Sequence, residues 1–243
     1  MTMTNVQGQI APGVAATVNG SSTLTLFGDN TLAGLALNNA GGGALATVNT
    51  GGTLTLTGGI TATSTNPSTI AMLGGTLDFG GSGASILVSP IQFNGVTVAP
   101  WTPALLVSAV VQNAGTLSVS GGGVLQLSGA STFAGGYSLA GDTGLAMGAS
   151  STPTAAGTLV TAGPLGTGTL RLQSGATLLA SSAFTVANPM TLQGTLNFAG
   201  ANSLVLNGAL ALGAGTSAFN TAVAGSILTL GGKLSGADVS LLK

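Results

Sequence analysis

The chain has 243 residues, of which 3 are Lys or Arg and 4 are Asp or Glu, so the formal net charge is −1. Only 3% of the residues are charged, whereas about a quarter are charged in an ordinary soluble domain, and the chain has no His and no Cys. This composition excludes an imidazole base, a thiolate nucleophile, zinc sites with the usual ligands and a disulfide-stapled scaffold.

The few charged residues are scattered along the chain, so no cluster for catalysis or for metal binding is predicted. The acids are Asp29, Asp78, Asp142 and Asp238, and the bases are Arg171, Lys233 and Lys243. Because nucleic-acid binding depends on Lys and Arg side chains that neutralise phosphates, we expect no nucleic-acid partner. We therefore predict no catalytic residue, no cofactor and no metal ion, and hence a protein that is not an enzyme.

Membrane helices are not predicted either, although 44% of the residues are hydrophobic. No stretch approaches the roughly 20 apolar residues that span a bilayer. The longest clear apolar run, Ala104 to Val111, is interrupted by Ser108.

A short phrase of alternating apolar residues recurs along the chain and predicts many short strands. Gly or Ser usually precedes it, two apolar residues stand two apart, and Gly often follows within a few positions. In chain order the copies are residues 22–26, 52–56, 75–79, 115–119, 123–127, 168–172, 194–198, 203–206, 208–212 and 226–230. Because strand side chains alternate between faces, each phrase predicts one buried apolar face and one face of Thr, Ser, Asn or Gln.

The repetition predicts a right-handed parallel β-helix, or β-solenoid, in which equivalent strands of successive coils stack. Coils of roughly 20 to 25 residues give about ten coils in one domain, residues 1–243. Asn-Gly pairs that begin at Asn19, Asn94 and Asn207 are typical of tight β-hairpins, so the sequence does not exclude hairpins at these positions.

Two segments carry a resemblance to a known family. Residues 123–141, from Gly123 to Gly141, resemble the passenger-associated β-strand repeat of bacterial autotransporters, with Ser131 and Phe133 where that pattern prefers Asn and Tyr. Residues 164–178 resemble the segment that follows this repeat, and residues 186–192 and, more weakly, 88–93 resemble its Asn-Pro-apolar turn. The match is best over residues 113–232, looser over 1–112, and leaves 233–243 as a C-terminal end.

The resemblance implies a β-helical passenger on the surface of a Gram-negative cell. Such passengers include adhesins, aggregation factors and a few enzymes. The family also has a signal peptide and a C-terminal translocator domain. The first residues lack the basic and apolar regions of a signal peptide. We therefore expect either a segment of a longer passenger or a free-standing solenoid that uses the same repeat.

Several motifs resemble calcium-binding or phosphate-binding sites, but we expect each of them to have a structural role. Residues 80–86 resemble one nonapeptide of a calcium-binding β-roll, but Ser85 stands in place of the Asp ligand. Residues 121–123 and 166–168 lack the spacing of phosphate-binding loops, so we expect coil corners there. Arg171 is expected to pair with an Asp of an adjacent coil.

The segment Pro100-Trp101-Thr102-Pro103 interrupts the repeat and contains the only Trp. Because Pro cannot donate a ladder hydrogen bond, and because loops leaving a solenoid commonly carry binding residues, Pro100, Trp101 and Pro103 form a candidate contact loop. A wide corner in which Trp101 covers the core is the alternative.

Together these observations predict a non-catalytic, surface-displayed structural or adhesive segment that acts by contact with an unknown host or cell-surface ligand, or by self-association. The near-zero net charge favours self-association. Two alternatives remain. Outward Thr residues, as at Thr23, Thr25, Thr53 and Thr55, are typical of ice-binding solenoids. A glycan-acting β-helix enzyme is the other alternative, and it would need Asp, Lys and Arg clustered on one face.

Overall fold

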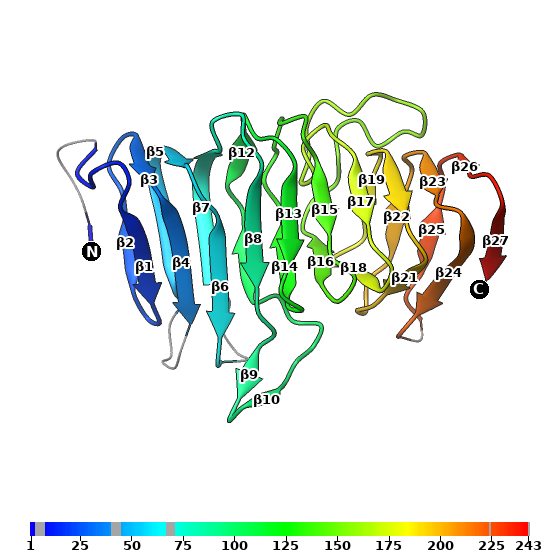
Figure 1. Ribbon diagram of the computed structural model, residues 1–243, viewed down its shortest axis with the longest axis horizontal. Coiled ribbons are helices and arrows are strands. Elements are labelled where there is room, and N and C mark those ends of the chain that lie inside the picture. Colours follow the sequence, from blue (N-terminus) through cyan, green and yellow to red (C-terminus); the bar gives the residue numbers. More distant parts are fainter. Residues whose placement is uncertain (3–7, 40–44, 67–70, 224, 243) are drawn as a thin grey trace.

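The computed structural model shows a parallel β-solenoid of about nine turns, as the sequence predicted (Figure 1). It describes residues 1–2, 8–39, 45–66, 71–223 and 225–242. Across these ranges the regular structure is all strand, and no helix long and apolar enough to cross a bilayer occurs in them.

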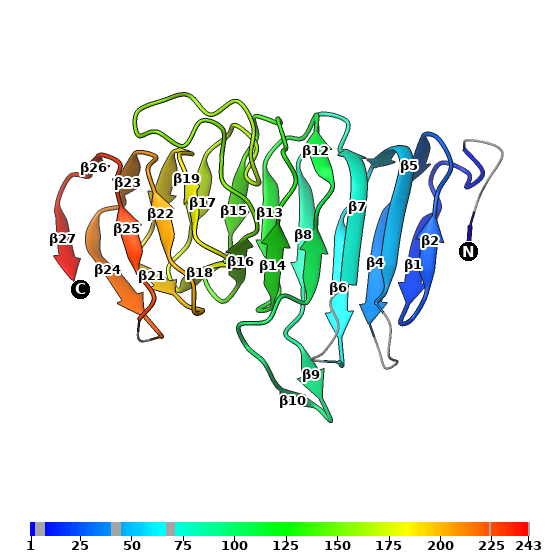
Figure 2. The ribbon, with the colours of Figure 1, turned by 180° about the vertical axis from the view of Figure 1, so that it is seen from behind.

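Two long parallel sheets run along the rod and face each other across its core (Figures 1 and 2). The first sheet contains, in spatial order, β1 (Ala15–Asn19), β4 (Gly34–Asn39), β6 (Ile60–Ser64), β8 (Ala84–Val88), β13 (Leu117–Ser120), β15 (Tyr137–Leu139), β17 (Leu170–Leu172), β20 (Met190–Leu192), β23 (Leu210–Leu212) and β26 (Leu234–Ser235).

The second sheet contains β2 (Thr23–Thr25), β5 (Thr47–Leu56), β7 (Ala71–Asp78), β11 (Leu105–Val107), β14 (Val124–Leu127), β16 (Gly144–Met147), β18 (Ala176–Ala180), β21 (Thr195–Phe198), β24 (Gly215–Thr221) and β27 (Val239–Leu242). Two further strands join it, β3 (Asn30–Leu32) on β5 and β12 (Val110–Gln112) on β7.

A third, shorter sheet consists of β19 (Phe184–Val186), β22 (Leu204–Leu206) and β25 (Leu228–Leu230).

The core consists of apolar side chains stacked in rows, one from each coil. Leu170, Met190 and Leu210 are aligned at intervals of 20 residues, and all three are buried. One cluster of buried side chains extends in this way from Val18 to Leu212. Because each strand bonds to the strands of the coils before and after it, the backbone groups are satisfied without charged residues on the surface.

The length of a coil varies more than the sequence indicated. Leu117 is aligned with Tyr137, 20 residues further on, whereas Leu139 is aligned with Leu172, 33 residues further on. The additional residues lie in corners between strands, so the rows of core side chains continue unbroken.

One part of the predicted surface is wrong. The outward-facing side chains of β14, β16 and β18 include Val124, Ala146 and Leu179, which are buried and form a separate small cluster with Ala199. Leu179 lies against Gly144, where an added Cβ would be 3.3 Å from its Cδ1 atom. The glycine leaves room for an apolar side chain to lie flat against the outside of the sheet.

Candidate contact surfaces

A hairpin insertion, residues 89–103, projects from the side of the rod at about the middle of its length (Figure 1). The chain leaves the first sheet at the end of β8, forms the antiparallel strands β9 (Gln92–Phe93) and β10 (Val96–Thr97), and returns to the second sheet at β11. Residues 88–93, which resemble a passenger turn, therefore lead out of the solenoid instead of into the next coil.

The tip of the hairpin insertion has a sequence that favours its geometry. Asn94 and Gly95 have φ angles of 50° and 76°, so both central residues are left-handed, as a type I′ hairpin turn requires. On either side of this turn Phe93 is 56% exposed and Val96 is 63% exposed. The turn thus holds two apolar side chains in solvent.

The base of the hairpin insertion is anchored in the solenoid. Ile91 is buried, and its carbonyl oxygen accepts a hydrogen bond from the amide of Val98 at 2.9 Å. The coil corner at residues 121–123 packs closely beneath it, because an added Cβ on Gly123 would clash with the carbonyl oxygen of Ser89. Residues 121–123 form a coil corner, as predicted. Glycine is required at Gly123 because two backbone segments approach each other too closely there to leave room for a side chain.

The candidate contact loop predicted from the sequence is the returning arm of this insertion. Pro100 and Trp101 are exposed, with Trp101 at 44%, whereas Pro103 is half-buried. Ala99 adopts a left-handed φ of 50°, and its carbonyl oxygen accepts a hydrogen bond from the amide of Thr102 at 2.9 Å. Residues 92–103 contain no charged side chain, so the insertion presents Phe93, Val96 and Trp101 on an uncharged support.

A second insertion, residues 152–162, lies on the opposite side of the rod (Figure 1) and was not predicted. An antiparallel bridge between Thr152 and Ala162 closes its base, and Thr152-Pro153 is a cis peptide bond. The side-chain amide nitrogen of Asn207 donates to the carbonyl oxygen of Thr154 at 2.7 Å, so the insertion is tied to a later coil. Leu159 within it is 83% exposed.

Three of the four acidic side chains, those of Asp29, Asp78 and Asp142, accept hydrogen bonds at turns. The carboxylate of Asp29 accepts from the amide of Thr53 at 2.7 Å, and that of Asp78 accepts from the amide of Gly80 at 2.6 Å. Asp142 accepts from the hydroxyl of Thr143 at 3.0 Å. Across the described ranges, no three metal-ligating side chains come together.

The prediction that Arg171 pairs with an Asp of an adjacent coil is wrong. Its neighbours in the row across the first sheet are Ser138 and Thr191, and its guanidinium donates to the carbonyl oxygen of Gly135 at 3.5 Å.

The outward Thr residues do not form one regular array. Thr23 and Thr25 are aligned with Thr47 and Asn49, and the row continues with Met72 and Gly74. A register shift within β5 separates this row from that of Thr53 and Thr55, in which Asp78 follows Thr55. In each row the coil that follows Thr-x-Thr replaces its second Thr, by Asn49 or by Asp78, so these residues do not form the flat lattice of Thr-x-Thr that ice binding would use.

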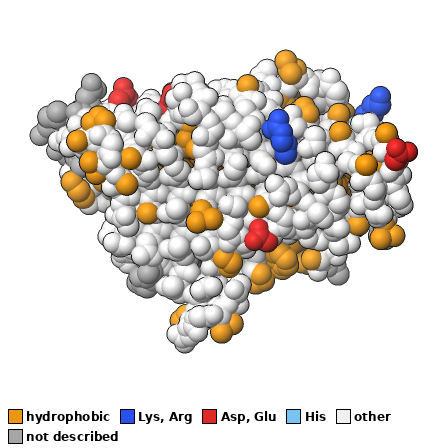
Figure 3. Space-filling view, in the orientation of Figure 1, with side chains coloured by type: hydrophobic (Ala, Val, Ile, Leu, Met, Phe, Trp, Pro, Cys, Tyr) orange, Lys and Arg blue, Asp and Glu red, His pale blue; other side chains and the backbone are white. Residues whose placement is uncertain are grey.

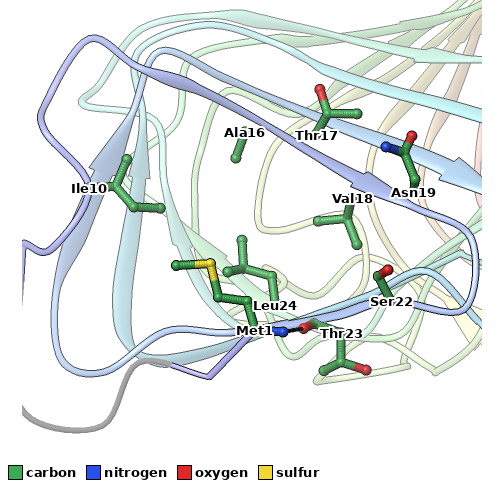
Figure 4. Close-up of a pocket in the computed structure, with 9 residues that line it drawn as sticks. All are labelled: Met1, Ile10, Ala16, Thr17, Val18, Asn19, Ser22, Thr23 and Leu24. Atoms are coloured by element: carbon green, nitrogen blue, oxygen red, sulfur yellow. Dashed lines mark hydrogen bonds between the residues drawn. The ribbon is translucent and has the colours of Figure 1, made fainter.

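Both ends of the rod have an apolar hollow. At the N-terminal end a hollow of about 390 Å³ lies between β1 and β2, where Ile10, Val18 and Leu24 point inward (Figure 4). The α-amino group of Met1 donates to the carbonyl oxygen of Thr23 at 2.6 Å, which holds Met1 along the edge of β2.

At the C-terminal end a hollow of about 610 Å³ opens between the last strands of the second and third sheets. Phe219, Leu228 and Leu230 line it and are half-buried, while Leu241 and Leu242 at its rim are 58% and 59% exposed. In Figure 3 apolar side chains are visible at both ends of a surface that is otherwise mostly uncharged.

Comparison with known proteins gives no further assignment: no family model matches the chain, and neither the curated proteins nor the solved structures contain a match. The β-solenoid fold therefore rests on the structure itself.

Proposed function

We propose that this chain is a non-catalytic, surface-displayed segment of an autotransporter-like passenger, and that it acts by contact through the hairpin insertion at residues 89–103. The observation that carries the proposal is the exposure of Phe93, Val96 and Trp101 on an anchored, uncharged projection. Isolated exposed apolar residues are common, but a group of two aromatic residues and one aliphatic residue on a projecting element is typical of an interaction site.

The passenger assignment is supported by residues whose structural roles suit the repeat. Phe133 and Tyr137, which lie in the best-matching segment, pack edge to face with ring centroids 5.4 Å apart. Ser131 is buried, and its hydroxyl accepts a hydrogen bond from the amide of Val111 at 2.9 Å. The genomic reading frame tests this assignment. A signal peptide upstream and a translocator domain downstream support it, and the absence of both contradicts it.

Adhesion tests the contact function. Beads coated with the purified chain are expected to bind cultured animal cells, or one another, more strongly than beads coated with albumin. Trp101→Ala is expected to reduce the bound fraction about tenfold, because a central aromatic contact is commonly worth 1.4 kcal/mol or more. Replacing Phe93 and Val96 together by Ser is expected to have a similar effect.

The matched control is Leu159→Ser, because Leu159 is 83% exposed on the second insertion. It removes an exposed apolar side chain and is expected to leave adhesion unchanged. Circular dichroism and thermal unfolding confirm that each variant is folded. Adhesion no stronger than that of albumin beads, or equal losses in Trp101→Ala and Leu159→Ser, would refute the proposed contact site.

A further inference from the structure

We propose that Asn94, at the tip of the hairpin insertion, is a modification site that loses its side-chain amide by spontaneous reaction with Gly95. The product carries a carboxylate, and it places a negative charge on residues 92–103, which contain no charged side chain. The modification itself follows from the structure of the turn. Its effect on adhesion rests on the contact function proposed above, to which it gives a limited lifetime.

The reaction proceeds through a cyclic imide. The backbone nitrogen of Gly95 loses its proton to solvent base and attacks the side-chain carbonyl carbon, Cγ, of Asn94. The new bond from this nitrogen to Cγ forms while the bond from Cγ to Nδ2 breaks, and ammonia leaves with a proton from solvent. Water then opens the ring on one side to give Asp, or on the other to give isoaspartate. The net reaction consumes water and releases ammonia, so it needs no oxidant or reductant.

The surroundings of Asn94 leave room for this ring. Both Asn94 and Gly95 are exposed, and an added Cβ on Gly95 would meet no described atom within 4 Å. Among the described residues, the Asn94 side chain has no hydrogen-bond partner that would hold it away from the backbone. The side-chain carbonyl group is therefore free to approach the backbone nitrogen, and solvent base and water reach both groups.

The hairpin around this turn opens easily. Its strands β9 and β10 align at two positions, Phe93 with Val96 and Gln92 with Thr97, and all four side chains are exposed. Both strands lie on the projection, away from the two long sheets (Figure 1). Because local opening costs least where few buried contacts are broken, the tip leaves the turn conformation readily, as ring closure requires. The glycine, which lacks a Cβ, adopts the new backbone angles without a steric penalty.

The other two Asn-Gly pairs of the chain are held in place. The side-chain nitrogen of Asn207 donates to the carbonyl oxygen of Thr154 at 2.7 Å. Gly208 is buried, and an added Cβ on it would clash with the backbone of the preceding coil. Asn19 is aligned with Asn38 in the first sheet, and its side-chain oxygen accepts a hydrogen bond from the Asn38 side chain at 3.2 Å. Ring closure at either pair requires a coil of the solenoid to open, so we expect Asn94 to react fastest.

The two products change the tip in different ways. Asp-Gly still suits a type I′ turn, so Asp at position 94 adds a charge between Phe93 and Val96 and keeps the hairpin. Isoaspartate carries the same charge and also lengthens the backbone by one carbon atom, because the chain then runs through the former side chain. Since an apolar contact must remove water from the charged group, either product opposes binding at this surface.

Peptide mapping tests the modification site. The purified chain is kept for several weeks in warm, mildly alkaline buffer and digested with pepsin, and mass spectrometry measures the converted fraction at each Asn-Gly pair. Asn94 is expected to convert about tenfold faster than Asn207, because the solenoid coil opens more rarely than the hairpin tip. The control is Asn94→Gly, since Gly-Gly also suits the turn and has no side-chain amide to lose. Conversion at Asn94 no faster than at Asn207 would overturn the proposal.

Adhesion tests the consequence, with each aged sample compared with a fresh sample of the same variant. Adhesion of the unmodified sequence is expected to fall in proportion to the converted fraction at Asn94, whereas aged and fresh Asn94→Gly should adhere equally. Fresh Asn94→Asp is expected to adhere less than the fresh unmodified sequence. Equal losses on ageing with and without Asn94 would overturn the effect on contact. If the fresh chain does not adhere, the contact function fails, while faster conversion at Asn94 still supports the modification site.

Discussion

Asn188 provides the sharpest test of how the coils are held together. Its side chain is fully buried, and its amide nitrogen donates to the carbonyl oxygens of Gly166 and Gly168 at 3.0 Å and 3.1 Å. The side chain thus joins the Asn-Pro turn of one coil to the glycine corner of the preceding coil. In the variant Asn188→Ala both carbonyl groups lose this donor.

The expected loss of stability in Asn188→Ala follows from these two hydrogen bonds. Each is worth about 1 kcal/mol net, and leaving buried acceptors unpaired costs more, so Asn188→Ala is expected to lower the free energy of unfolding by about 2–4 kcal/mol. For a chain of this size that corresponds to a decrease in Tm of roughly 5–15 °C. Asn188→Asp, which keeps the shape but removes the donors, is expected to cost at least as much.

Urea and thermal unfolding followed by circular dichroism provide the measurement. Asn38→Ala is the control, because the Asn38 side chain forms only solvent-exposed bonds, to Asn19 and Thr63, and its loss is expected to cost less than about 0.5 kcal/mol. If Asn188→Ala unfolds at the same midpoint as Asn38→Ala, the assignment of coil cohesion to this side chain is refuted.

Two further predictions concern buried aromatic residues. Burial raises the pKa of Tyr137, the only Tyr, above its ordinary value of 10.0. Because the unfolded chain then loses the phenol proton first, stability is expected to fall as the pH rises above about 10. Tyr137→Phe should remove this part of the pH dependence of the urea midpoint, and an unchanged slope would contradict the reasoning. Phe198→Ala is expected to lower the free energy of unfolding by about 3–5 kcal/mol, because Phe198 is fully buried. Phe93→Ala is the control, because Phe93 is 56% exposed, and it should change the free energy of unfolding by less than about 0.5 kcal/mol. Equal losses of stability on urea unfolding would disprove the assigned core.

The solenoid could be predicted because alternation is a local property of the sequence. Leu117 and Val119 stand two apart and point into the core, as the pattern indicates. The position of each phrase within its coil could not be predicted in the same way. Leu117 lies in the first sheet and Leu196 in the second, although both follow Gly-Thr. A phrase that suits either sheet carries no information about which one it joins.

The projecting elements were predicted only in part. Pro100 and Trp101 indicated that the repeat is interrupted, and the Asn94-Gly95 pair indicated a hairpin, but nothing in the sequence showed that the two signals belong to one insertion. The second insertion, residues 152–162, was not predicted from the sequence. Its closure depends on the bridge between Thr152 and Ala162 and on the distant Asn207, and such contacts are visible only when the coils are stacked.

The unbroken rows of core side chains have a consequence for how such a chain can change. Leu139 and Leu172 remain aligned although the coil between them contains a whole additional loop. Since doubling the length of a flexible loop costs only about 0.6 kcal/mol in closure entropy, a corner can accept a new segment with little effect on the scaffold. Residues 89–103 and 152–162 therefore mark two corners at which segments can be lengthened, shortened or replaced while the rows of core side chains keep their register.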